Sequence, residues 1–252
     1  MSLQPEGPSP ALPESPSLSL AGRFVAVFAR PVSAWSGLAE RSQWWFPLLL
    51  TTLLQVAVML PLYERAYLPM YFDQLDSQIS SGALDPASAA KAEQIMESPA
   101  MGPVVACVAG LTNVVMTFVF ALVIWFGVGF VLGARFRYRL ALEVTAWAGL
   151  VWIPQQLAFF AVAWSQETMK GIHFGLAAFL PEADPPAKWH AMLTVALDAF
   201  GPFNIWFVAV AVMGCAALSG APRRSVAWVL GGLAVALAVV SALLSGWLAP
   251  AS

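Results

Sequence analysis

The chain has 252 residues, of which 60% are hydrophobic and 10% are charged, whereas about 25% of the residues in an average soluble domain are charged. A soluble protein of this length could not cover its surface with so few charges, so the composition predicts a polytopic membrane protein. The formal net charge of −2 gives no basis for nucleic-acid binding, which needs a basic surface.

The chain begins with residues 1–18, which we expect to form a disordered tail. This stretch is rich in Pro and Ser and carries Glu6 and Glu14. It lacks the positive region and the early apolar run of a secretory signal.

Residues 19–43 have the pattern of an amphipathic helical segment. Leu20, Phe24 and Val27 share one helical face, and Pro31 divides the segment. Two placements are open. The helix either lies in the membrane interface, or it is buried against the rest of the protein.

Five apolar runs are long enough, or nearly so, to cross a bilayer core, which takes about 20 residues of helix. They are Trp44–Leu62, Pro103–Gly133, Leu140–Ser165, a run within Ala191–Ser219 that begins near Pro202, and Val226–Ala249. Pro154 interrupts the third run. The predicted fold is therefore all-α, with a membrane domain of five transmembrane helices over residues 44–252.

Two long loops connect these spans on one side. In the first, residues 63–102, the second half is predicted to be helical, because Asp85 suits an N-cap and Pro86 suits the first helical position. The second loop, from Gln166 to His190, contains several prolines and is expected to be less regular.

Basic residues indicate the orientation of the spans. One side of the membrane would hold Arg23, Arg30, Arg41, Arg135, Arg137, Arg139, Arg223 and Arg224. The other side would hold Arg65, Lys91, Lys170 and Lys188, spread over the two long loops. Because positive residues concentrate in short cytoplasmic connections, the N-terminus is predicted in the cytoplasm and the C-terminus outside.

The arginines of the second–third connection form the densest basic group. Arg135, Arg137 and Arg139 lie within a few residues of one another. The topology signal alone can account for them. They also suit contacts with anionic lipid, at about 1 kcal/mol per residue, or with a protein partner.

Glu143 is an acid within the third predicted span. An acid inside a membrane is by default a hypothesis for a functional site. Arg139 lies one helical turn earlier, near the headgroups, so a structural ion pair in reach of water is the favoured interpretation. A role in a partner or ion site is the alternative.

Further polar residues predict a seam inside the helix bundle. They are Gln155, Gln156, Asp198 and Asn204, with Asn113 and Gln55 on other spans. Asp198 either caps the amides freed at Gly201–Pro202 or faces a cavity with the other members. Such residues most often hold helices together, but a small transporter would also need them.

The sequence contains no pattern typical of a catalytic, cofactor or metal site, so we expect the protein not to be an enzyme. His173 and His190 fall in the outer loops and are interpreted as surface residues. Cys107 and Cys215 each lie in an apolar run, as small hydrophobic residues do.

Two small-residue pairs allow close approach of helices. They are Gly129 with Gly133 and Gly232 with Ala236, each four residues apart. Packing inside the bundle is the favoured use of this spacing. Formation of a homodimer is the alternative.

Several segments resemble bacterial Yip-domain integral membrane proteins in their order and spacing. They are Phe28–Trp35, residues 40–50, Gly133–Arg139 with the residues from Glu143 onward, and Leu197–Phe200. The resemblance covers about residues 24–249. Eukaryotic members bind Rab GTPases and carry an Asp-Leu-Tyr-Gly-Pro motif before their first span. The similar Asp198–Pro202 lies before the fourth span here, which leaves Rab binding unsupported.

The resemblance implies five spans and a non-enzymatic scaffold or accessory subunit for other membrane proteins, such as an ABC-type exporter. The excess of arginine over lysine and the high alanine content indicate a bacterial chain, hence the inner (plasma) membrane. Expected partners are membrane lipid and other membrane proteins. The alternative function is a small transporter or permease that uses the polar seam.

Overall fold

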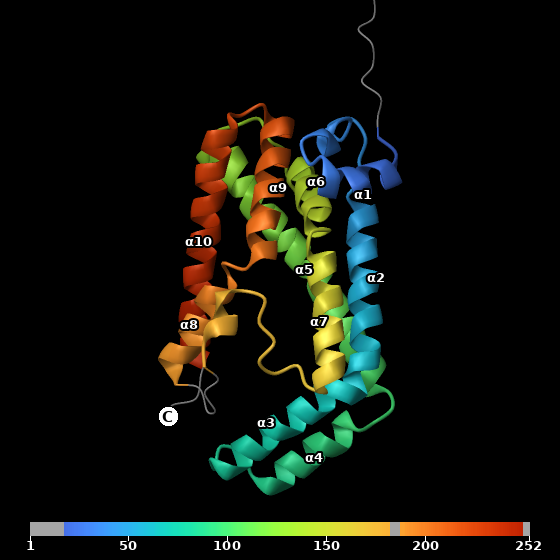
Figure 1. Cartoon of the computed structure of the whole chain (residues 1–252), viewed down its shortest axis with the longest axis vertical. Coiled ribbons are helices and arrows are strands. Elements are labelled where there is room, and N and C mark those ends of the chain that lie inside the picture. The colour runs from blue at the N-terminus through green and yellow to red at the C-terminus, as the bar shows by residue number, and fades with distance from the viewer. Residues whose placement is uncertain (1–17, 182–186, 249–252) are drawn as a thin grey trace, which may run out of the picture.

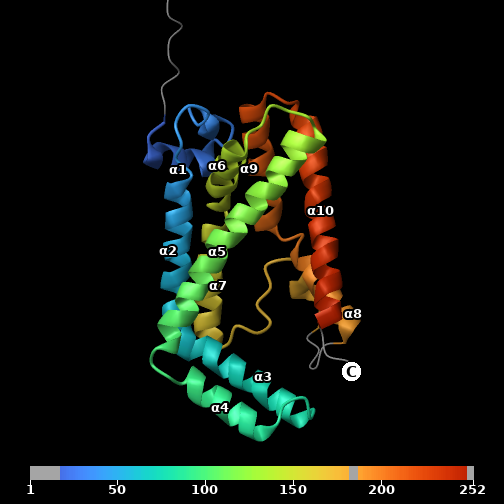
Figure 2. The same cartoon turned by 180° about the vertical axis from the view of Figure 1, so that it is seen from behind.

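The computed structural model describes residues 18–181 and 187–248, and the regular elements within these ranges are all helices. The main bundle, shown from two sides in Figures 1 and 2, contains α2 (Trp45–Leu62), α5 (Met101–Trp125), α6 (Tyr138–Gly149), α7 (Trp152–Gln166), α9 (Pro202–Ser219) and α10 (Arg223–Leu248). Four helices are apolar and long enough to cross a membrane, and the bent pair α6–α7 makes a fifth crossing if it counts as one span. The predicted all-α polytopic class is confirmed. The predicted tail lies outside the described residues, except for Leu18.

A short N-terminal segment covers one end of the bundle (Figure 1). It consists of α1 (Leu20–Ala29) and a 3₁₀ turn, η1 (Ser33–Trp35). Ser19 caps α1 by accepting a hydrogen bond from the Gly22 amide at 3.1 Å. Val27 and Leu38 are fully buried in the main core. Of the two placements left open by the sequence, the structure therefore has the helix packed against the bundle.

A helical hairpin projects at the opposite end (Figure 1). The chain leaves α2 through a π-helical turn, η2 (Tyr63–Tyr67), and continues as α3 (Leu68–Ser80) before turning into α4 (Pro86–Met96). Asp85 caps α4 by accepting from the Ser88 amide at 3.0 Å, as the sequence pattern predicts. The helix before it was not anticipated, because its residues are too polar to continue an apolar run.

The core is built around α6, whose residues from Leu140 to Gly149 are all buried. Helices α5, α9 and α1 contact it. Close approach of α10 to the end of α5 occurs at Gly127, where an added Cβ would lie 2.6 Å from a Leu233 methyl. Packing inside the bundle is wrong as the use of the pair Gly232 and Ala236, since Gly232 faces open space and Ala236 is exposed, whereas Gly129 packs closely on the Phe136 carbonyl.

One crossing is bent within the bundle, and the chain is also broken between α8 and α9. Helices α6 and α7 are bent by 40° at Leu150–Val151. The short helix α8 (Lys188–Asp198) packs along α10, and α9 starts only after a break at residues 199–201. As the sequence predicts, Pro202 is the first residue of α9, where its missing N–H costs nothing.

The connection from α7 to α8 turns back into the bundle instead of staying outside it (Figure 1). It contains a 3₁₀ turn, η4 (Leu176–Phe179). Gly175 packs directly on the end of α8, because an added Cβ would lie 2.6 Å from the Cα atom of Asp198 and 2.8 Å from the Leu197 carbonyl. The described residues of the connection are irregular apart from η4, as the sequence predicts for the loop from Gln166 to His190, up to the start of α8.

Candidate functional site

A buried guanidinium holds the N-terminal segment together. Arg23 is only 1% exposed. It donates hydrogen bonds to Gln43 Oε1 at 3.0 Å, to the Ser36 carbonyl at 2.9 Å and to the Ala34 carbonyl. It also lies 5.6 Å from the centre of the Trp147 ring. Burial lowers the pKa of Arg23 and the Glu143 carboxylate opposes this shift, so the side chain stays charged.

Glu143 is fully buried on α6 and acts as a cap for another helix. Its Oε1 accepts from the Gln43 amide at 2.7 Å and from Ser42 Oγ at 2.9 Å. These donors lie just before α2, whose own N-cap residue Trp44 makes no side-chain capping bond. A carboxylate placed at this helix start is stabilised by the free amides and the helix dipole.

The predicted ion pair between Arg139 and Glu143 is present but long, with 3.9 Å between Nη1 and Oε1. Arg139 instead donates to the carbonyls of Leu38, at 3.4 Å, and Ala39. The expectation that Glu143 reaches water is wrong, because α1 and the segment after it cover the carboxylate. Arg135 and Arg137 are exposed.

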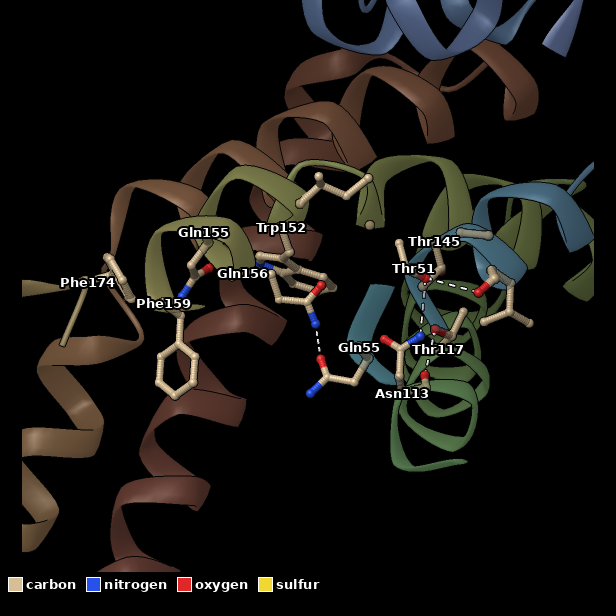
Figure 3. Close-up of a pocket in the computed structure, with 14 residues that line it drawn as sticks. Thr51, Gln55, Asn113, Thr117, Thr145, Trp152, Gln155, Gln156, Phe159 and Phe174 are labelled. Atoms are coloured by element: carbon tan, nitrogen blue, oxygen red, sulfur yellow. Dashed lines mark hydrogen bonds between the residues drawn. The ribbon is translucent and has the colours of Figure 1, made fainter. Parts of the chain in front are cut away.

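A polar pocket of about 340 Å³ lies among α2, α5, α6 and α7 (Figure 3). Asn113 Nδ2 donates to Thr51 Oγ1 at 3.2 Å and to Thr52 Oγ1 at 3.0 Å. Gln156 donates to Gln55 Oε1 across the pocket. All the residues that line it are uncharged: Leu48, Thr51, Gln55, Asn113, Thr117, Thr145, Ala146, Gly149, Trp152, Ile153, Gln155, Gln156, Phe159 and Phe174.

A larger and mostly apolar groove of about 770 Å³ lies beside this pocket. Its walls come from α5, α7, α8, α9, α10 and the returning connection. The pocket and the groove meet at residues that line both, namely Trp152, Gln155, Phe159 and Phe174. Gln155 makes no hydrogen bond through its side chain to any described residue.

The break before α9 holds a small polar cluster at the groove. His173 Nδ1 lies 2.6 Å from Asp198 Oδ2, and the histidine, interpreted from the sequence as a surface residue, is half-buried. Trp152 Nε1 donates to Asn204 Oδ1 at 3.2 Å, and Asn204 Nδ2 donates to the Asp198 carbonyl at 3.1 Å. Asp198 does not cap α9, because the N-cap is Gly201 and receives no side-chain bond.

The structure thus divides the predicted seam into two parts. Gln156 lies in the pocket, Asp198 and Asn204 lie in the groove, and Gln155 belongs to both. Gln55 and Asn113 join the pocket as well. The sequence analysis missed the threonines of the pocket.

Their spacing held a usable signal, because polar residues four apart share a helix face. Thr51 precedes Gln55 by this interval and Thr117 follows Asn113 by it.

The described part of the chain offers few other groups for a metal or thiol site. No group of three or more His, Cys, Asp or Glu residues within residues 18–181 and 187–248 could hold a metal ion. His190 Nε2 lies 2.9 Å from the Pro181 carbonyl. Cys215 is buried and Cys107 is exposed, and both are free thiols.

A comparison with protein families gives one result. The family model for the Yip1 domain matches residues 25–245, a range that includes the covered end, the pocket and the groove. The chain matches no curated protein and no solved structure.

Proposed function

Because this chain belongs to the Yip1 family, we propose that it is a non-enzymatic scaffold or accessory subunit for other membrane proteins. The observation that supports this role is the basic face at the α1 end. Arg30, Arg41, Arg135, Arg137, Arg223 and Arg224 are all exposed. The segments that carry them lie at this one end of the bundle (Figure 1).

We propose that the basic face lies in the cytoplasm of a bacterium and that the protein sits in its inner membrane. The positive-inside rule supports this orientation, because arginines lie in the short turn before α6 and at the start of α10. The α3–α4 hairpin would then lie outside. An acidic surface of a partner, such as a subunit of an ABC-type exporter, or the anionic headgroups beside it would complement the arginines.

Charge reversal tests the accessory role. In-cell crosslinking followed by mass spectrometry should recover a defined membrane partner with the natural chain. The double variant Arg135→Glu, Arg137→Glu should lose that partner, because opposite charge on an exposed rim lowers association. Lys91→Glu, on α4 at the other end, is the matched control and should retain it. A monodisperse lone protein in mild detergent, with no crosslinked partner in cells, would contradict the proposal.

The polar pocket favours a second candidate function, a small transporter. Discontinuous helices that line a polar site within the membrane are a feature of many transporters. The bent crossing α6–α7 lines the pocket, and the break between α8 and α9 lines the groove. If the pocket opens to both sides in turn, Asn113→Cys should react with a water-soluble maleimide from either face. The background would carry Cys107→Ser and Cys215→Ser. Labelling from neither side would contradict transport.

A further inference from the structure

The pocket and the groove differ in chemistry and are adjacent, because both are lined by Gln155 and Phe174. The pocket offers amides and hydroxyls, and the groove offers aliphatic and aromatic surface. Ligand sites in proteins commonly have 300–1,000 Å³, a range that includes both volumes. A polar compartment joined to an apolar one fits a molecule that is itself divided into a polar head and an apolar chain.

The groove has the length of a lipid chain. Along α10 it extends from Leu230 to Ser241, which is about 16 Å of helix at 1.5 Å per residue. This equals about half of a bilayer core, whose thickness is about 30 Å, and so corresponds to one leaflet. The small side chains of Ala234 and Ala238 leave room along this face.

The pocket is suited to a head without charge. A phosphate group there would be buried without a cationic partner among the residues that line the pocket, and burial of an unpaired charge is costly. Asn113 and Gln156 use their amide N–H groups to bind Thr51, Thr52 and Gln55. Their side-chain carbonyl oxygens are left to accept hydrogen bonds.

Gln155 adds a free amide at the junction of the two compartments. It can both donate and accept, so it would satisfy a hydroxyl that enters from the groove. Figure 3 shows its side chain beside Phe159, at the edge of the pocket nearest to Phe174.

We propose that the protein binds a neutral, hydroxyl-bearing lipid, with the head in the central pocket and one chain in the groove between α9 and α10. The site does not depend on the accessory role. A lipid would still bind if no protein partner existed, and the basic face would still recruit a partner if the site stayed empty.

Photolabelling in nanodiscs tests the chain compartment. The probe is diacylglycerol with a diazirine on one acyl chain, and phosphatidylglycerol with the same chain is the anionic comparison. Diacylglycerol should label peptides of α9 and α10 more strongly. Gly231→Trp should reduce this labelling about tenfold or more, a loss of at least about 1.4 kcal/mol, because Gly231 lines the groove and faces open space.

Gly232→Trp is the matched control, because the neighbouring glycine also faces open space but does not line the groove. It should label like the natural chain. Equal labelling of the two variants, or equal labelling by the anionic probe, would show ordinary surrounding lipid and overturn the proposal.

A second pair of variants tests the head compartment. Gln155→Leu removes the free amide and should lower the preference for diacylglycerol about three- to tenfold, the effect of one lost hydrogen bond. Gln166→Leu, an exposed position on the same helix, should have no effect. An unchanged preference in Gln155→Leu, with the chain compartment still labelled, would refute the assignment of the head to this pocket.

Discussion

At the scale of single residues, two buried ionic groups determine how the α1 end is closed. Arg23 donates hydrogen bonds to carbonyl oxygens of the segment that follows α1. Glu143 accepts hydrogen bonds from donors that lie just before α2. The two groups lie on different elements, and Gln43 bonds to both of them. Arg23 is therefore satisfied mainly by carbonyl groups of the backbone, whereas Glu143 is satisfied through Oε1 alone and its Oε2 is buried without a hydrogen-bond partner among the described residues.

Replacement of Glu143 by Leu should destabilise the protein by about 3–5 kcal/mol, the usual cost of removing one member of a buried charged network. Glu143→Gln should cost less, because its amide oxygen can still accept from the Gln43 amide. Thermal unfolding in detergent, followed by tryptophan fluorescence, should give the highest melting temperature for the natural chain, a lower one for Glu143→Gln and the lowest for Glu143→Leu. Equal losses for both variants would mean that the charge alone matters.

At the scale of elements, the contact between the returning connection and the end of α8 shapes the groove. Gly175 allows this contact, because no side chain fits between it and the backbone of Asp198. His173 then reaches Asp198 and Phe174 packs edge-on against Phe203. One small residue thus brings both an aromatic and a titratable side chain to the break between α8 and α9.

Gly175→Ala should displace the connection, because the clash is with backbone atoms that cannot rotate away. We expect faster proteolysis of the α7–α8 connection and a melting temperature several degrees lower, as a loss of about 1–3 kcal/mol would give. Gly232→Ala, in open space within α10, should be neutral or stabilising. A normal proteolysis pattern in Gly175→Ala would contradict the backbone contact.

The N-cap of α4 provides a pH-dependent contribution. Hydrogen bonds from Ser88 lower the pKa of Asp85 below its ordinary value of 3.8. The stabilisation is therefore fully present above that ordinary value and is lost as the pH falls through the lowered, folded-state pKa. Hydrogen exchange of the first turn of α4 should accelerate in this acidic window relative to Asp85→Asn, whose neutral cap does not titrate. Parallel pH profiles of hydrogen exchange for the natural chain and Asp85→Asn would contradict this pH-dependent contribution.

At the scale of the whole molecule, local signals were sufficient where an element depends on its own residues. The apolar runs predict the crossings, Asp85–Pro86 predicts the start of α4, and Pro202 predicts the start of α9. The break in the third crossing falls next to Pro154, which stands in the first turn of α7.

The remainder depends on contacts between distant segments, which no local pattern contains. Arg23 looked like an exposed topology signal, but carbonyls from a later turn surround it. His173 looked peripheral, but the fold returns its loop to Asp198. The predicted seam named polar residues correctly without showing that the bundle divides them between a polar and an apolar compartment.

The unbroken helical path from α2 through η2 to α3 has a mechanical consequence. The helical backbone runs from Trp45 to Ser80 and bends at η2, where α3 turns away from α2 (Figure 1), so one continuous segment joins the α1 end of the bundle to the hairpin. Its near end is held by the Glu143 carboxylate, and its far end carries the α3–α4 hairpin. A displacement of the near end is thereby coupled to the hairpin through covalent backbone, and it would be shared with α5, α6 and α7, which pack against α2.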